Sequence, residues 1–266
     1  MKRNCARTFA VIETRPEATD VGADHFMDGA LVLRQPVRGH RVGTDAVLLA
    51  AAIATPEGCV IDAGAGIGAV GLMLARRAPT IDVTLVEVDP LSAALARENI
   101  DLNGFGSRAR VVEADLVAVK SRRAAGLVDQ SADLILTNPP WLTPGRSRPS
   151  PDGRRALAHI MGAEGLTGWL RGIAALTRPD GRMAIIAPAQ SLAELLGACA
   201  GRFGDLAILP LHPRANEPAI RLLAVGRKGS RAGLRLLPGL VLHTPEGAFT
   251  PLVEALHRGK ATLDLK

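Results

Sequence analysis

The chain has 266 residues, of which 47% are hydrophobic and 22% charged, and this composition is typical of a globular protein and excludes collagen, coiled-coil and disordered chains. Lysine and arginine outnumber aspartate and glutamate by 32 to 26, and the net charge of +6 favours a polyanionic partner without requiring one. No apolar run reaches the roughly 18 residues of a membrane-spanning helix, and the N-terminus lacks a secretory signal pattern, so we expect a cytoplasmic protein. Three scattered cysteines and six histidines without ligand spacing predict neither disulfides nor a structural metal.

The first predicted elements lie between residues 30 and 54. Residues 30–37 form a short apolar run that is compatible with a strand. Thr44 is expected to be the N-cap of a helix over residues 46–54, with the carboxylate of Asp45 near the positive end of that helix.

From Gly58 onward, apolar strand-like runs alternate with helical patterns. The predicted strands cover residues 60–61, 83–88, 110–113, 132–137, 181–187, 206–211 and 220–225. The predicted helices cover residues 68–78, 91–103, 164–176, 191–200 and 251–256. Asp89 and Pro90 have the residue types of an N-cap and a first helical residue, and they mark the start of the helix at 91–103.

This alternation predicts a doubly wound α/β fold with a mostly parallel sheet of seven strands. The turn between the strands at 206–211 and 220–225 is too short for a parallel crossover, so the last strand is expected to be antiparallel. We predict an N-terminal extension over residues 1–43, the main domain over 44–226, and a C-terminal tail over 227–266 that packs on it.

A glycine-rich loop over residues 61–68 follows the predicted strand at 60–61. Gly64, Gly66 and Gly68 allow a ligand to approach the backbone closely, which predicts a cofactor site. The G-x-G-x-x-G run that begins at Gly66 also satisfies the dinucleotide fingerprint, so the loop alone leaves a nicotinamide cofactor open. Glu87 ends the next strand and is placed to accept hydrogen bonds from ribose hydroxyls, which suits either cofactor.

Two later positions separate these alternatives. Asp115 follows the third strand of the main domain and is placed to accept a hydrogen bond from an adenine amine, and the fourth strand ends in the turn 138–141. This ordered set resembles the class I S-adenosylmethionine-dependent methyltransferases, which implies a Rossmann-like fold with S-adenosylmethionine as cofactor. The resemblance implies that Asp62, Gly64, Gly66, Gly68, Glu87, Asp115 and Asn138 contact this cofactor.

The turn Asn138-Pro139-Pro140-Trp141 is the predicted catalytic centre. Two prolines fix the backbone and remove two N–H donors, so the turn presents carbonyl acceptors. The Asn138 side-chain oxygen and the Pro139 carbonyl are able to accept both hydrogens of a planar NH₂ group, while Trp141 offers a stacking surface. Holding both hydrogens frees the nitrogen lone pair to attack a sulfonium methyl, and carbonyl dipoles stabilise the positive charge that arrives on the amine.

The same tetrapeptide matches the [NDS]-P-P-[YFW] motif of amino methyltransferases that act on adenine, guanine or glutamine amides. Cytosine carbon-5 methyltransferases are excluded because they need a nucleophilic cysteine after a proline, and none of the three cysteines has that position. The predicted acceptor is therefore an exocyclic NH₂ group.

Residues 35–49 resemble the N-terminal signature of the bacterial tRNA adenine-N6 methyltransferases that modify a valine tRNA beside its anticodon, and residues 211–214 and 240–243 resemble the C-terminus of that family. The resemblance implies adenine N6 in tRNA as acceptor, and we include Thr44 and Asp45 in the expected cofactor site. Trp141 departs from the family, which usually has tyrosine or phenylalanine there.

Basic residues around these motifs predict contacts with RNA phosphates. A loop over residues 143–155 carries four arginines against one aspartate, and a basic turn precedes Thr44. Both segments are also compatible with solvated surface loops that bind nothing. The predicted RNA-binding residues are Arg38, His40, Arg41, Arg146, Arg148, Arg154 and Arg155.

Four alternatives to the tRNA enzyme remain at this point. A ribosomal-RNA guanine-N2 methyltransferase shares the amine chemistry. A release-factor glutamine methyltransferase shares the Asn-Pro-Pro turn but normally has a larger helical N-terminal domain than the 43 residues that precede Thr44 here. From other classes, a nicotinamide oxidoreductase or a non-catalytic nucleotide-binding module requires the turn at 138–141 to be coincidental.

Overall fold

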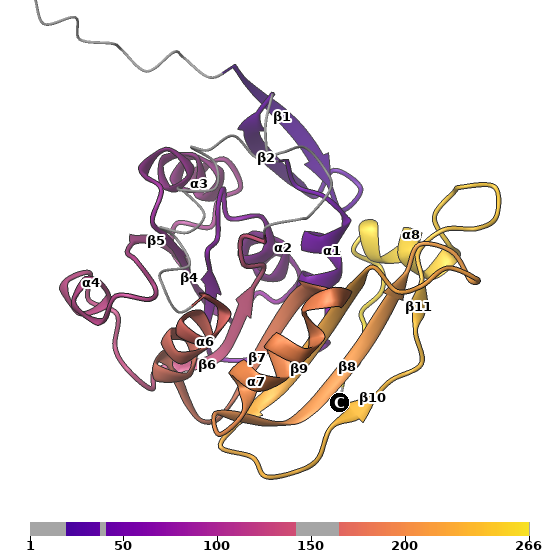
Figure 1. The fold of residues 1–266 in the computed structure, drawn as a ribbon. Coiled ribbons are helices and arrows are strands. Elements are labelled where there is room, and N and C mark those ends of the chain that lie inside the picture. Colours follow the sequence, from indigo (N-terminus) through magenta and orange to yellow (C-terminus); the bar gives the residue numbers. More distant parts are fainter. Residues whose placement is uncertain (1–19, 38–40, 142–164, 266) are drawn as a thin grey trace, which may run out of the picture.

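The computed structural model of the chain describes residues 20–37, 41–141 and 165–265, and a mixed β-sheet with helices on both faces forms its centre (Figure 1). The strand order is β10-β8-β9-β7-β6-β3-β4-β5, with β11 also paired to β8. Strands of the sheet are β3 (Cys59–Ala63), β4 (Asp82–Glu87), β5 (Ala109–Glu113), β6 (Ala132–Thr137), β7 (Thr177–Pro188), β8 (Phe203–His212), β9 (Arg221–Lys228), β10 (Arg235–Leu236) and β11 (Leu240–Val241).

The helices lie between these strands and after them. They are α1 (Thr44–Ala51), α2 (Ala69–Arg77), α3 (Pro90–Leu102), α4 (Val119–Ala124), α6 (Gly165–Leu176), α7 (Leu192–Cys199) and α8 (Pro251–His257), with a 3₁₀ turn at Ala189–Ser191. No helix in the described part of the chain is both long and apolar enough to span a bilayer.

The strand directions confirm the predicted α/β class. β3, β4, β5, β6 and β7 pair in parallel, whereas β9 is antiparallel to both of its neighbours, β7 and β8. The seven predicted strands correspond to β3–β9, and the two-residue strands β10 and β11 bring the sheet to nine. Because the long strands other than β9 run in parallel, their carboxyl ends meet at one edge of the sheet.

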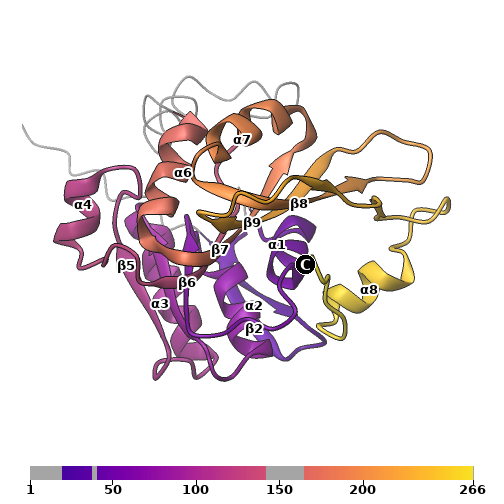
Figure 2. The same cartoon turned by 90° about the horizontal axis from the view of Figure 1, so that it is seen from below.

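Alternate residues of each central strand pack on opposite faces, so two separate hydrophobic cores form. In β6, Leu134 and Leu136 belong to one core with side chains of α1 and α2, while Ile135 belongs to the other core with side chains of α6 and α7. Figure 2 shows α6 and α7 on one face of the sheet and α1, α2 and α8 on the other. Burial on both faces explains why these strands read as continuous apolar runs.

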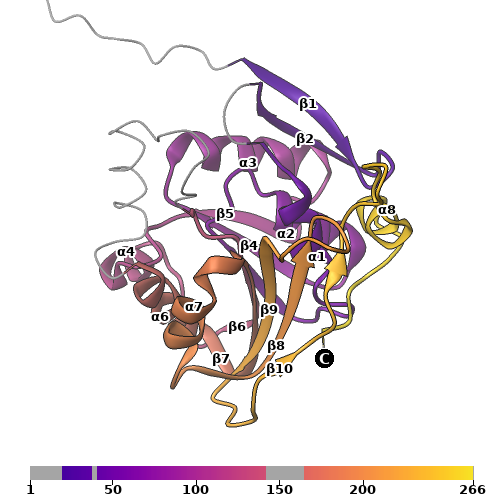
Figure 3. The same cartoon turned by 45° about the vertical axis from the view of Figure 1, so that its right-hand side comes forward.

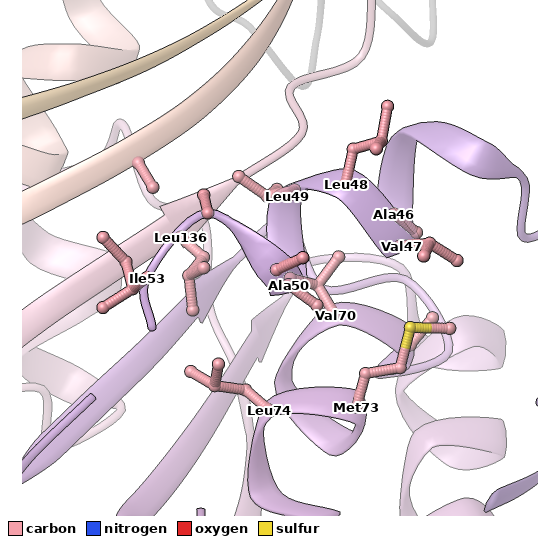
Figure 4. Close-up of a cluster of buried hydrophobic side chains, with 14 of the residues drawn as sticks. Ala46, Val47, Leu48, Leu49, Ala50, Ile53, Val70, Met73, Leu74 and Leu136 are labelled. Carbon is pink, nitrogen blue, oxygen red and sulfur yellow. The ribbon is translucent and has the colours of Figure 1, made fainter. Parts of the chain in front are cut away.

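The first core joins α1 to α2 beneath the edge where the strands end. Ala50 of α1 lies beside Val70 of α2, and Leu48 and Leu49 of α1 and Leu136 of β6 belong to the same cluster (Figure 4). The N-cap lies one residue earlier than predicted: Gly43 is the N-cap, no side chain caps the helix, and Thr44 is its first helical residue. The prediction that Thr44 caps α1 is therefore wrong, and the helix ends at Ala51 instead of continuing to residue 54.

A hairpin outside the main sheet precedes α1. Its strands, β1 (Val21–Phe26) and β2 (Leu31–Pro36), are antiparallel and lie beside α3 (Figure 3). Asn99 of α3 accepts from the Arg34 amide at 2.7 Å and donates to the Arg34 carbonyl at 3.0 Å. Asn103, one turn further, makes the same pair of bonds with Val32. These amides bind the free edge of β2 and thereby attach the hairpin to the main sheet's helical layer.

The C-terminal residues pack on α1. Val253 and Leu256 of α8 and Leu263 beyond it are buried in the first core, and the Leu263 amide donates to the Ala51 carbonyl at 2.8 Å. The C-terminal segment therefore supports α1.

Candidate functional site

A cavity of about 640 Å³ opens at the edge where the parallel strands end. Its walls come from residues after β3, β4, β5 and β6, from the start of α1 and from Arg221 at the start of β9. The volume lies within the range of small-molecule and cofactor sites, and the position is where open α/β sheets bind ligands. The predicted catalytic turn and most of the predicted cofactor residues line this same cavity.

The glycine loop after β3 has a left-handed backbone at its three glycines, with φ of 71° at Gly64, 55° at Gly66 and 88° at Gly68. A Cβ at Gly66 would meet no atom within 4 Å, so this position faces open space in the cavity. A Cβ at Gly68 would lie 2.7 Å from the Leu85 side chain. Gly68 is not among the residues that line the cavity, and its contact with Leu85 serves the packing of α2 on β4; its contact with the cofactor stays a prediction.

Asp62 lies beneath this loop with 1% of its surface exposed. Its carboxylate accepts from the Gly71 amide at 2.8 Å and so joins the end of β3 to the first turn of α2. Burial raises the pKa of Asp62 to about 7; the Gly71 hydrogen bond opposes that shift and the charge of Glu87 adds to it. Although Asp62 borders the cavity, its contacts make it a support for the loop.

Glu87 ends β4 and turns its carboxylate under the glycine loop. One oxygen accepts from Gly66 at 2.7 Å, and the other accepts from Val88 at 2.8 Å and Asp89 at 2.9 Å. Three backbone N–H groups occupy about three of the four acceptor positions of a carboxylate. The side chain is therefore held rigidly at the cavity wall, with little acceptor capacity left beyond one further donor.

Asp115 follows β5 on the same wall. Its Oδ1 accepts from the amides of Val117 at 2.8 Å and Ala118 at 3.3 Å, while its own amide donates to the Ser121 hydroxyl at 2.9 Å. These bonds close the turn that leads into α4 and fix the carboxylate beside the cavity. Asp115 and Glu87 are thus brought together at one end of the cavity by neighbouring strands.

The turn at 138–141 lines the cavity at the end of β6. Pro139 is buried, while Asn138, Pro140 and Trp141 are half-buried. The Trp141 indole N–H donates to the Ile186 carbonyl of β7 at 3.2 Å, so the ring is attached to the sheet. Phenylalanine or the phenol of tyrosine has no ring N–H to make this bond.

Trp169, which no sequence motif marks, also lines the cavity. This residue of α6 is 2% exposed, and its indole N–H donates to the Thr137 hydroxyl at 3.0 Å. Thr137 in turn donates to the Ala63 carbonyl at 2.8 Å. The one sequence signal was scarcity, since the chain has two tryptophans, and position 169 lies in a helix that carries no motif.

The start of α1 closes another side of the cavity. Thr44 and Asp45 line it, and the Asp45 carboxylate pairs with the Arg221 guanidinium at 2.9 Å. Arg221 is not among the predicted site residues, because only the antiparallel course of β9 brings it to this edge. Arg41, predicted to bind RNA, lines the cavity and forms an ion pair with Asp24 of β1.

The other predicted RNA-binding residues lie outside the described residues: Arg38, His40, Arg146, Arg148, Arg154 and Arg155. Among the described residues, no three His, Cys, Asp or Glu side chains gather closely enough to hold a metal ion.

Comparison with known proteins gives consistent results. The family model described as "Methyltransferase small domain" matches residues 40–150. The chain is 31% identical over 220 residues to the tRNA1(Val) (adenine(37)-N6)-methyltransferase of Porphyromonas gingivalis, which covers 79% of this chain and 84% of that protein. It is 32% identical to the protein of the same name from Aeromonas hydrophila, covering 79% of this chain and 85% of that one. The crystal structure of a predicted O-methyltransferase from Agrobacterium tumefaciens is 36% identical and covers 82% of this chain and 97% of that chain, with a TM-score of 0.69.

Proposed function

The chain belongs to the family of the tRNA1(Val) (adenine(37)-N6)-methyltransferases, and on that premise we propose that it methylates the exocyclic amine of an adenine in tRNA, with S-adenosylmethionine as methyl donor. The observation that carries the proposal is the shared cavity: the glycine loop and the Asn138-Pro139-Pro140-Trp141 turn line one space at the end of neighbouring strands β3 and β6. A cofactor and an acceptor base held there would have their reacting groups side by side.

The cavity has the chemistry that S-adenosylmethionine requires. At Gly66 the open space and positive φ leave the backbone free to approach a ligand. The carboxylates of Glu87 and Asp115 are acceptors, and the ribose hydroxyls and the adenine amine of the cofactor are donors. We assign one ribose hydroxyl to the acceptor position that Glu87 has left and the adenine amine to Asp115. Thr44 and Asp45, which line another side of the cavity, complete the proposed cofactor site. When bound, the cofactor supplies a methyl group on a positively charged sulfur, open to displacement by a nitrogen lone pair.

The turn after β6 binds the acceptor in this proposal. The Asn138 side-chain oxygen and the Pro139 carbonyl accept the two amine hydrogens, and Trp141 stacks on the base. Because the indole N–H of Trp141 is bound to Ile186, its ring keeps one orientation before the base arrives, which lowers the entropy cost of stacking. The acceptor carbonyls also favour the positive charge that develops on the nitrogen, and water removes the final proton.

An RNA substrate agrees with the net charge of +6, because basic residues attract phosphates. It also agrees with the proposed chemistry, because proteins commonly read RNA through unstacked bases of single-stranded loops. Arg41 borders the cavity and is the described member of the predicted RNA-binding set. We propose that it and the six basic residues outside the described ranges contact the phosphates on either side of the target base.

The experiment that tests the proposed function uses purified protein, radiolabelled S-adenosylmethionine and three acceptors: tRNA, ribosomal RNA and total protein. Label is expected in tRNA and, after digestion, in N6-methyladenosine. Label in N2-methylguanosine, in glutamine or in a ribose oxygen would contradict the assignment of the acceptor. Calorimetry with S-adenosylhomocysteine and NAD separates the cofactor classes, since binding of NAD alone would overturn the proposal.

The Agrobacterium protein, as a predicted O-methyltransferase, would transfer its methyl group to oxygen. In this chain, the carbonyl-rich turn favours nitrogen, because an NH₂ group offers two hydrogens to two acceptors whereas a hydroxyl offers one. The nucleoside analysis distinguishes the two outcomes directly.

A further inference from the structure

We propose that Thr137 and Trp169 are a positioning pair that holds the catalytic turn at a fixed distance from the glycine loop. The inference rests on the proposed function and adds two residues to which that proposal gives no contact with the cofactor or the acceptor. The chain of contacts is continuous: the Trp169 indole donates to Thr137, Thr137 donates to the Ala63 carbonyl, and both hydrogen bonds are buried. Thr137 immediately precedes Asn138, and Ala63 immediately precedes Gly64.

The second contact of Trp169 is steric. A Cβ at Gly64 would lie 3.0 Å and 3.1 Å from two atoms of its six-membered ring, so the ring packs directly against the backbone of the glycine loop. One side chain of α6 therefore contacts the loop through its ring and the residue before the turn through its N–H group. A displacement of either segment relative to the other would break one of these contacts.

The rest of α6 supports this arrangement. Gly172 is three residues after Trp169 and lies on the same helix face. A Cβ at Gly172 would lie 2.5 Å from the carbonyl oxygen of Leu116, which follows Asp115. The helix thus packs closely against three of the segments that carry the proposed cofactor and acceptor contacts: the glycine loop, the Asp115 turn and the end of β6. Its apolar residues, among them Leu166 and Leu170, anchor it in the second core.

The bonds resist displacement because their groups are buried. Thr137 is 0% exposed and Trp169 is 2% exposed, so neither group can exchange its partner for bulk water. A buried donor or acceptor left unpaired costs about 1–3 kcal/mol. Methyl transfer needs its two reacting atoms in close alignment, and a misplacement of about 1 Å costs roughly a hundredfold in rate.

The main test is Thr137→Val, which keeps the side-chain shape and removes both hydrogen bonds. We expect kcat on tRNA at saturating substrates to fall by about tenfold to a hundredfold, with the Kd for S-adenosylhomocysteine within about threefold of wild type, since the residues assigned to the cofactor are unchanged. Thr137→Ser keeps the hydroxyl and is expected to retain wild-type kcat. A Thr137→Val enzyme whose kcat is within twofold of wild type would overturn the inference.

A double variant separates positioning from stability. Thr137→Val leaves the buried Trp169 N–H without an acceptor, and the second substitution, Trp169→Phe, removes that donor. Replacing both partners by apolar groups recovers part of the lost stability. A positioning role predicts that the melting temperature rises from the single to the double variant while kcat stays low. Recovery of kcat together with stability would show a merely structural role.

Thr177→Val is the matched control. Thr177 is also 0% exposed and its hydroxyl donates to the Ile173 carbonyl at 2.8 Å, but it starts β7 at the edge of the sheet opposite the cavity. This variant is expected to lose stability without a change in kcat. An equal fall in kcat in Thr177→Val and Thr137→Val would contradict the inference.

Amide hydrogen exchange on the protein without substrates gives a readout independent of methyl transfer. Gly64 and Ala65 both donate their amides to the Val86 carbonyl, at 2.9 and 3.0 Å. Exchange at these two amides is expected to accelerate in Thr137→Val and to stay at the wild-type rate in Thr177→Val. Unchanged exchange in Thr137→Val would overturn the coupling. If wild-type protein labels no RNA, the proposed function fails, and the exchange rates still decide whether the pair fixes the loop.

Discussion

At the scale of single residues, Asn138 is the side chain on which the proposed chemistry depends most directly. Asn138→Ala removes one of the two acceptors for the amine hydrogens, so kcat is expected to fall by about a hundredfold or more. The Kd for S-adenosylhomocysteine is expected to stay within about threefold, because Asn138 is one of several expected cofactor contacts and the glycine loop, Glu87 and Asp115 are intact. Asn138→Asp keeps acceptor oxygens and should retain more activity than the alanine variant. Steady-state kinetics on tRNA and calorimetry measure the two quantities, and full activity in Asn138→Ala would remove the residue from the mechanism.

Asp62 gives a pH prediction, because burial raises its pKa from 3.8 to about 7. Below about pH 4 the group is protonated in both folded and unfolded chains; between pH 4 and 7 the unfolded chain loses the proton that the folded protein keeps. Its contribution therefore makes the protein less stable as pH rises. Relative to Asp62→Asn, the free energy of unfolding of wild type should fall by up to about 1.4 kcal/mol per pH unit between pH 5 and 7. Urea unfolding at pH 5, 6 and 7 measures the difference, and a pH-independent difference would contradict the assignment.

At the scale of elements, Gly66 and Gly68 of the glycine loop have different surroundings: Gly66 faces the open cavity, whereas Gly68 packs against Leu85. Gly66→Ala adds a methyl group in the open cavity and strains a positive φ at a cost of about 1–2 kcal/mol, so its main effect should be weaker cofactor binding, by about tenfold or more. Gly68→Ala places a Cβ against Leu85 in addition to the strained φ and should destabilise the fold more. Calorimetry with S-adenosylhomocysteine and thermal unfolding separate the variants. Equal loss of affinity at equal loss of stability in both would contradict the distinction.

Elements that depend on local pattern were predictable, whereas those that depend on packing were not. β6 has the predicted bounds, and the Asp89 side chain caps α3 by accepting from Ser92 as its sequence suggests. β1 was missed because its side chains are half-exposed and include Asp24 and His25, so no apolar run marks the strand. The sequence motifs likewise locate most of the candidate site, because each motif is a local pattern. Trp169 and Arg221 reach the site only through the packing of α6 on the sheet and the antiparallel direction of β9.

At the scale of the whole molecule, the order of strands divides the cavity between two ligands. β3, β4 and β5 end in the glycine loop, Glu87 and the Asp115 turn, which make the proposed cofactor half. On the other side of β3, β6 ends in the Asn138 turn, and β7 and β9 continue that wall to Arg221. In the proposed function the cofactor and the acceptor therefore meet between β3 and β6, where the Thr137 hydroxyl donates to the Ala63 carbonyl.

The last prediction concerns the C-terminal segment, which we propose folds with the main domain as one cooperative unit. Leu263 is 7% exposed in the first core, so Leu263→Ala should cost about 2–3 kcal/mol, while Leu252→Ala, at an α8 residue that is 44% exposed, should cost less than about 0.5 kcal/mol. Tryptophan fluorescence reports on positions 141 and 169, which belong to the second core, whereas circular dichroism reports on all helices. If the segment unfolded independently, Leu263→Ala would shift the dichroism transition and leave the fluorescence transition in place. Because α8 and Leu263 pack on α1, which packs on α2 and β6, we expect both transitions to shift together by the same amount.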